Sequence, residues 1–168
     1  MYNDYILHLR FKEKVMKKLF VYMSLLTVSL ISFSAVPAVA NDTLYTRIGG
    51  YDVIAKFSAG LIDGFYADPA FTRFTEGGAP AEVVARDKQL TAEYMCKITG
   101  GPCFYIGKDM LSVHKDLAIT GDEWSALMAI AISVTADLDM KPGDEKEFLR
   151  LVDNIKKLMN IQSPAENR

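Results

Sequence analysis

Four stretches of the sequence place apolar residues three and four positions apart, and this spacing most constrains the fold. The stretches are residues 51–66, 81–99, 121–138 and 144–160. Such spacing puts the apolar side chains on one face of an α-helix, whereas a half-buried strand would alternate apolar and polar residues. No alternating pattern occurs along the chain. The sequence therefore predicts an all-α domain with four principal helices.

Short motifs mark the ends of these helices. The segment Thr120–Glu123 reads TGDE, a capping box in which a threonine and a glutamate satisfy the first backbone N–H groups of a helix. Gly100-Gly101-Pro102 ends the second helix, and Pro142-Gly143 separates the third from the fourth. We expect two further short helices, over residues 41–50 and 108–116. The third long stretch is apolar on nearly all sides, which predicts a central position for it.

The N-terminus has the composition of an export signal. Met16-Lys17-Lys18 precedes a long apolar run, and Ala38-Val39-Ala40 is the small-x-small pattern that a signal peptidase recognises. We expect cleavage after Ala40 and a periplasmic or otherwise exported protein. Because the apolar run approaches the length of a membrane span, an uncleaved anchor is the alternative. The chain thus divides into an N-terminal extension and signal peptide (1–40), a folded domain (41–160) and a C-terminal tail (161–168).

Charge and cysteine content narrow the function classes. The whole chain has a net charge of −2 at pH 7, and removing residues 1–40, which are rich in lysine, makes the remainder more acidic. This composition predicts no nucleic-acid partner and no membrane surface once the signal is removed. The exported compartment permits a disulfide between Cys96 and Cys103, and two buried thiols are the alternative. The absence of CxxC and HExxH motifs excludes the common zinc and thioredoxin-type sites.

The chain has two histidines, His8 and His114, and only His114 survives the expected processing. Apolar residues surround His114 in the sequence, Met110 and Leu111 before it and Leu117 after it. A lone histidine on an apolar face is usually a packed residue, and single aromatic and methionine side chains are usually core. Together, however, they match what a haem requires, which is a neutral imidazole held in an apolar cleft that excludes water.

Three segments carry a resemblance to a known family. They are LYTRIGGYDVI from residue 44, FYADPAFTRF from residue 65 and TGGPCFYIGKDMLSVHKDLAIT from residue 99. In their order, spacing and single histidine they resemble the truncated haemoglobins of the first group. The resemblance covers nearly all of residues 44–158. It implies a truncated globin fold, a two-over-two helical sandwich around a haem.

By this resemblance His114 is the proximal ligand of the iron of a haem b. Its other ring nitrogen is expected to bond a backbone carbonyl or water, with Asp116 as a less favoured partner. Lys88, Lys97 and Lys108 are candidate partners of a haem propionate. The resemblance also implies these haem contacts: Phe74, Tyr94, Met95, Tyr105, Met110, Leu111, Leu117, Ile119, Trp124 and Met128.

The side of the pocket where a ligand would bind departs from the family. Many members carry a tyrosine and a glutamine that donate hydrogen bonds to bound oxygen, and these positions fall on Ile62 and near Thr91 in this sequence. Losing such a donor costs about 1–3 kcal/mol, which predicts faster oxygen release. Tyr66, Tyr94 and Gln89 are candidate substitutes. Lys88, Met95 or a tyrosine would be the candidates for a sixth protein ligand to the iron.

These features favour a haem protein that reversibly binds oxygen, nitric oxide or carbon monoxide. The alternative is a haem-based sensor or electron-transfer module that acts through a protein partner, and a helical interaction domain without haem is a third reading. Turnover of nitric oxide by bound oxygen is chemistry of the family, but it needs a redox partner, and the sequence contains no flavin or nicotinamide motif. No catalytic residue is therefore assigned, and the enzyme question stays open.

Overall fold

The computed structural model describes Met16 and residues 42–75, 78–159 and 161. The chain divides into residues 1–40, of which Met16 alone is described, and residues 41–168, which contain the fold. The predicted signal peptide, its cleavage site and most of the C-terminal tail therefore lie outside the described residues. Within the described ranges, no helix combines the length and the hydropathy that a membrane crossing requires.

The described residues form helices and no strand, as the sequence predicts. Most predicted bounds are within two residues of those observed. The four principal helices are α3 (Tyr51–Ala67), α5 (Ala81–Ile98), α7 (Gly121–Ala136) and α8 (Pro142–Leu158). The short elements are α2 (Leu44–Arg47), the 3-10 helix η2 (Pro69–Phe71), α4 (Thr72–Thr75) and α6 (Met110–His114).

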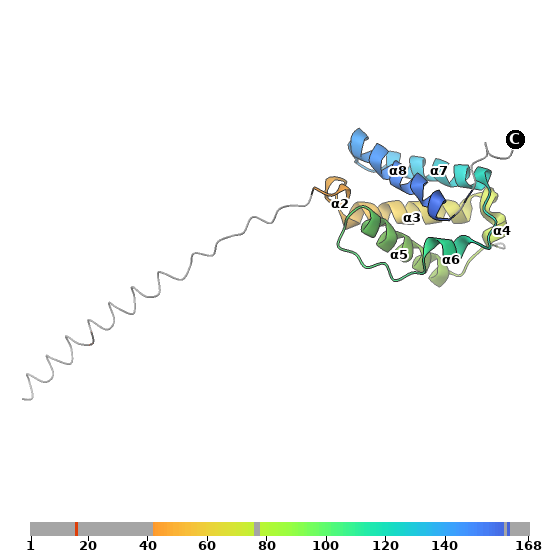
Figure 1. The fold of residues 1–168 in the computed structure, drawn as a ribbon, viewed down its shortest axis with the longest axis horizontal. Coiled ribbons are helices and arrows are strands. Elements are labelled where there is room, and N and C mark those ends of the chain that lie inside the picture. Colours follow the sequence, from red (N-terminus) through yellow and green to blue (C-terminus); the bar gives the residue numbers. More distant parts are fainter. Residues whose placement is uncertain (1–15, 17–41, 76–77, 160, 162–168) are drawn as a thin grey trace, which may run out of the picture. The chain divides into compact units, whose positions relative to one another are not determined.

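The long helices form two pairs (Figure 1). Helix α3 packs against α5 and against α7, while α8 packs against α7 and also contacts α2 and α6. The core lies between the pairs, where the rings of Phe57 in α3 and Phe148 in α8 meet edge to face with centroids 4.7 Å apart. Both rings are completely buried. The predicted two-over-two helical sandwich is therefore the observed architecture.

Two glycines let α3 approach α7 closely. A Cβ atom at Gly64 would lie 2.5 Å from Cγ2 of Ile130, and one at Gly60 would lie 2.9 Å from Cγ1 of Val134. The four-residue spacing places both glycines on one face of α3. Helix α7 packs against both α3 and α8, as its predicted central position requires. It is not covered on all sides, however, since Ile132 in α7 is 52% exposed.

The helix termini follow local sequence signals with one exception. Thr120 and Glu123 form the predicted capping box at the start of α7, and Thr43 caps α2. The last long helix was expected to start at residue 144, after Pro142-Gly143, but it begins at Pro142 itself. Proline is favoured in the first turn of a helix because its missing N–H is not needed there.

Cys96 and Cys103 form a disulfide with their Cα atoms 5.8 Å apart. The bond joins the last turn of α5 to the segment that leads into α6. Cys96 is completely buried. Of the two alternatives that the sequence leaves open, the disulfide is therefore the one observed, and it fixes the path of the chain just before the helix that carries His114.

Candidate functional site

His114 is the last residue of the short helix α6. This helix begins because the Asp109 carboxylate accepts a hydrogen bond of 2.9 Å from the backbone N–H of Ser112. The Ser112 side chain first, and then this backbone contact, lower the pKa of Asp109. Nδ1 of His114 lies 2.7 Å from the carbonyl oxygen of Met110. A carbonyl only accepts, so Nδ1 carries a hydrogen, and the tautomer that this contact selects for a neutral imidazole has its lone pair on Nε2. The expected backbone partner is present, and the imidazole is oriented to act as a ligand through Nε2.

His114 borders a cavity of about 280 Å³ with mainly apolar walls. The residues that surround it come from all four long helices or the segments next to them. They are Phe65, Tyr66, Phe71, Phe74, Asp87, His114, Leu117, Ile119, Glu123, Trp124, Leu127 and Met159. We call this the histidine cavity.

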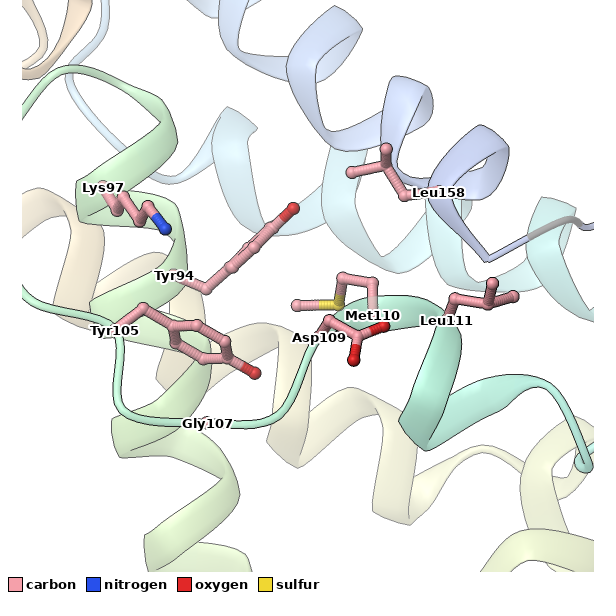
Figure 2. A pocket seen from close by; sticks show the side chains of 8 residues that line it. All are labelled: Tyr94, Lys97, Tyr105, Gly107, Asp109, Met110, Leu111 and Leu158. Carbon is pink, nitrogen blue, oxygen red and sulfur yellow. The ribbon is translucent and has the colours of Figure 1, made fainter.

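A second cavity of about 410 Å³ lies at the other end of α6. Figure 2 shows its lining residues, with Tyr94 of α5 and Met110 of α6 directed into the space between their helices. The Tyr94 and Tyr105 rings make an edge contact with centroids 5.1 Å apart, and burial raises the pKa of both phenols. The remaining lining residues are Lys97, Gly107, Asp109, Leu111 and Leu158. We call this the tyrosine cavity.

The structure divides the predicted haem contacts between these two cavities and the core. Met95 is 2% exposed in the core, Met128 packs against the core, and neither borders the histidine cavity or the tyrosine cavity. Phe74, Leu117, Ile119 and Trp124 line the histidine cavity together with His114. Tyr94, Tyr105, Met110 and Leu111 line the tyrosine cavity.

Arg73 fixes the wall of the histidine cavity beside Phe74. Its guanidinium pairs with both carboxylate oxygens of Glu123, at 2.5 and 2.8 Å, and donates to the carbonyl oxygens of Leu117 and Ala118. The guanidinium carbon also lies 3.9 Å from the centre of the Phe74 ring. Arg73 and the capping contacts lower the pKa of Glu123 to about 2. This network joins α4 to the segment that follows His114.

Tyr66 and Asp87 form a polar pair on the histidine cavity. The Tyr66 hydroxyl donates a hydrogen bond of 2.7 Å to Oδ2 of Asp87, which joins α3 to α5. Burial first, and then the Asp87 carboxylate, raise the pKa of Tyr66 to about 12. The phenol is therefore protonated at neutral pH. Tyr66 was one of the expected substitutes for the missing oxygen-binding tyrosine, but its partner Asp87 was not anticipated.

The other residues considered for the ligand side do not line the histidine cavity. Ile62 and Thr91 are half-buried in α3 and α5, and neither borders either cavity. Gln89 is exposed and donates to Glu93 in its own helix at 2.9 Å. Tyr94 borders the tyrosine cavity instead.

Of the three lysines considered for a propionate, one borders either of the two cavities described above. Lys97 lines the tyrosine cavity, whereas Lys88 pairs with Asp63 at 2.6 Å across α5 and α3. Lys108 is exposed and lies just before α6. Lys97 is thus the cation best placed to meet an acidic group on a molecule held between α5 and α6.

The sequence alone did not predict that Asp87 lines the histidine cavity or that Arg73 holds its wall. Only Asp87 could have been found from a local sequence pattern. Asp87 lies seven residues before Tyr94, two turns of helix, so a helical projection puts both on one face of α5, where each borders a different cavity. Arg73 lies 50 residues from Glu123, and no local pattern connects them.

Comparison with known proteins shows the family to which the chain belongs. The model of the bacterial-like globins matches residues 43–161. No curated protein matches the chain. The chain belongs to the bacterial-like globin family.

Solved structures share its fold at low sequence identity. The Fe(III) truncated haemoglobin of Tetrahymena pyriformis is 18% identical, with 70% of this chain and 97% of that chain covered and a TM-score of 0.61. A 2/2 haemoglobin of Synechococcus with covalently attached haem is 20% identical, over 70% and 98%, with a TM-score of 0.58. The group II truncated haemoglobin of Bacillus anthracis is 16% identical, over 72% and 92%, with a TM-score of 0.60. The fold is therefore that of the truncated 2/2 haemoglobins.

Proposed function

We propose that this protein is a haem-binding globin of the first truncated group that reversibly binds a diatomic gas. His114 would ligate the iron, and oxygen, nitric oxide or carbon monoxide would bind on the opposite side of the haem. The observation that carries the proposal is the orientation of His114, whose Nδ1 is committed to the Met110 carbonyl while the ring borders a mainly apolar cavity.

The residues present fit a haem. A porphyrin supplies four nitrogen ligands itself, so a single imidazole is enough to complete the attachment of the iron. The aromatic and aliphatic walls would cover the ring system, and Lys97, which lines the tyrosine cavity, would pair with a propionate that reaches that cavity. When bound, the haem iron would supply the open coordination position at which a gas binds.

Haem b, held without a covalent bond, is the form that the side chains favour. Covalent attachment through cysteine requires free thiols, and the described chain has none because Cys96 and Cys103 pair. His114 is also the only histidine after His8, and its Nε2 is required for the iron. We further propose that residues 1–40 direct export, consistent with a disulfide in the folded domain.

The absorption spectrum of the purified protein tests the proposal. Protein expressed with haem available would be recorded as ferric, dithionite-reduced and carbon monoxide-bound forms. We expect a Soret band that shifts with carbon monoxide. His114→Ala should lose tight haem binding and recover it when free imidazole is added, whereas the exposed neighbour variant Lys115→Ala should match the wild type. A His114→Ala protein with an unchanged spectrum would refute the assignment.

One observation favours a second candidate, a haem module that exchanges electrons with a protein partner. Phe104 and Ile106 are 88% and 67% exposed, on either side of Tyr105, whose ring turns inward against Tyr94. Exposed apolar side chains held on a crosslinked loop are typical of a docking surface. Replacing both with serine should slow reduction of the ferric protein by a reductase that reduces the wild type, while dithionite reduces both equally.

A further inference from the structure

The hydrogen-bonding state of the histidine cavity indicates which ligands it accepts. Three of its lining side chains carry a neutral N–H or O–H donor, and each donor is already committed. Tyr66 donates to Asp87, Trp124 Nε1 donates to Asp153 at 2.9 Å, and His114 Nδ1 donates to a backbone carbonyl. A hydroxyl or an indole nitrogen has one hydrogen to give. The lining side chains therefore have no donor left for a ligand.

The same cavity carries negative charge. Two carboxylates line it, Glu123 and Asp87. Glu123 is neutralised by the guanidinium of Arg73. Asp87 has a phenol as its partner, which donates a hydrogen bond but brings no charge. Its second oxygen, Oδ1, has no partner among the described residues, so it can accept a hydrogen bond from a ligand.

We propose that the Tyr66–Asp87 pair makes the histidine cavity select nitric oxide and carbon monoxide over anionic ligands and over dioxygen. This inference rests on the proposed function, because it concerns the gas that would bind opposite His114. A carboxylate repels an anion in a cavity of low dielectric constant. Asp87 comes from α5 and His114 from α6, so a haem held between these helices would have Asp87 on the side opposite His114. Donors on that side of a haem favour dioxygen, and there Asp87 would offer an acceptor. Nitric oxide and carbon monoxide need no donor.

The pair also removes the effect that a tyrosine would otherwise have on dioxygen release. A tyrosine that donates to dioxygen slows its release, so its replacement by phenylalanine accelerates release by about tenfold or more. Tyr66 gives its hydrogen to Asp87 instead. The Tyr66→Phe variant should therefore release dioxygen no more than about twofold faster than the wild type.

Asp87→Asn is the decisive variant. It removes the charge, keeps the size of the side chain and turns an acceptor into a potential N–H donor. We expect the affinity of the ferric protein for azide to rise by about tenfold or more. Dioxygen release from the ferrous protein should slow, and carbon monoxide affinity should change by less than about threefold. Asp139→Asn is the matched control, because Asp139 is exposed, borders neither cavity and undergoes the same change of charge.

Two readouts do not depend on ligand affinity. The infrared C–O stretch of the carbon monoxide form reports the electric field at the ligand, and it should shift to lower frequency in Asp87→Asn but not in Asp139→Asn. In the haem-free protein, NMR titration of the Tyr66 phenol should give a lower pKa in Asp87→Asn than in the wild type, because the carboxylate helps to raise it.

The outcomes separate this inference from the function on which it rests. If the wild type binds haem through His114 and the two asparagine variants have equal azide affinity, the selectivity inference is wrong and the proposed function stands. A Tyr66→Phe variant that releases dioxygen about tenfold faster would also overturn it, since Tyr66 would then be a donor to the ligand. A wild type that binds no haem would overturn both.

Discussion

Reduction of the disulfide between Cys96 and Cys103 should destabilise the domain by about 2 kcal/mol. The bond joins residues seven positions apart. Closing so short a loop in the unfolded chain removes conformational entropy worth about 2 kcal/mol at room temperature. The reduced protein regains that freedom when it unfolds, and no side chain has to be replaced to make the comparison.

The assay is urea unfolding followed by circular dichroism, with and without a phosphine reductant. For a domain of this size the free energy of unfolding falls by about 1–3 kcal/mol per molar urea. The midpoint should therefore drop by about 0.7–2 M on reduction. The variant Cys103→Ser lacks the bond and should unfold at the same midpoint in both buffers. A wild-type shift below about 0.3 M would refute the entropic reasoning, because it would mean that the unfolded chain is restricted without the crosslink.

Further predictions concern packing, pH and a buried hydroxyl. Gly64→Ala should cost about 1–3 kcal/mol of stability in urea unfolding because its methyl group would overlap Ile130, whereas Gly143→Ala, which meets open space, should cost nothing; equal midpoints would contradict the close approach of α3 to α7. The folded-state pKa of Glu123 is depressed to about 2, so its ion pair and cap stabilise the protein above the unfolded value of 4.5 and lose that effect as the pH falls towards 2. The stability difference between the wild type and Glu123→Gln, measured by urea unfolding from pH 7 to pH 3, should therefore shrink below pH 4.5, and a difference independent of pH would contradict this. Ser58 is completely buried and its hydroxyl has no partner among the described residues, so Ser58→Ala should be neutral or raise stability by about 1 kcal/mol, and a clear loss in urea unfolding would point to a hidden partner.

Much of the fold follows from signals that lie close together in the sequence. The spacing of apolar residues predicts α3, α5, α7 and α8, because a helix has a fixed period and each signal lies within a few residues. The capping box at Thr120 and Glu123 predicts the start of α7 for the same reason. The short helix before His114 and the family resemblance likewise depend on contiguous motifs. The exception is Pro142, where a helix breaker also serves as a helix starter.

The sequence by itself thus determined the helices, their caps and the single imidazole that can serve the site. The tertiary structure alone decided which side chains meet around that imidazole. Tyr66 and Asp87 lie 21 residues apart, and Arg73 and Glu123 lie 50 apart. Each contact depends on the angle, register and separation at which two helices or loops pack, and these follow from the fit of the whole core rather than from any local pattern. The pairing of Tyr66 with the acceptor Asp87 is therefore visible only in the folded protein.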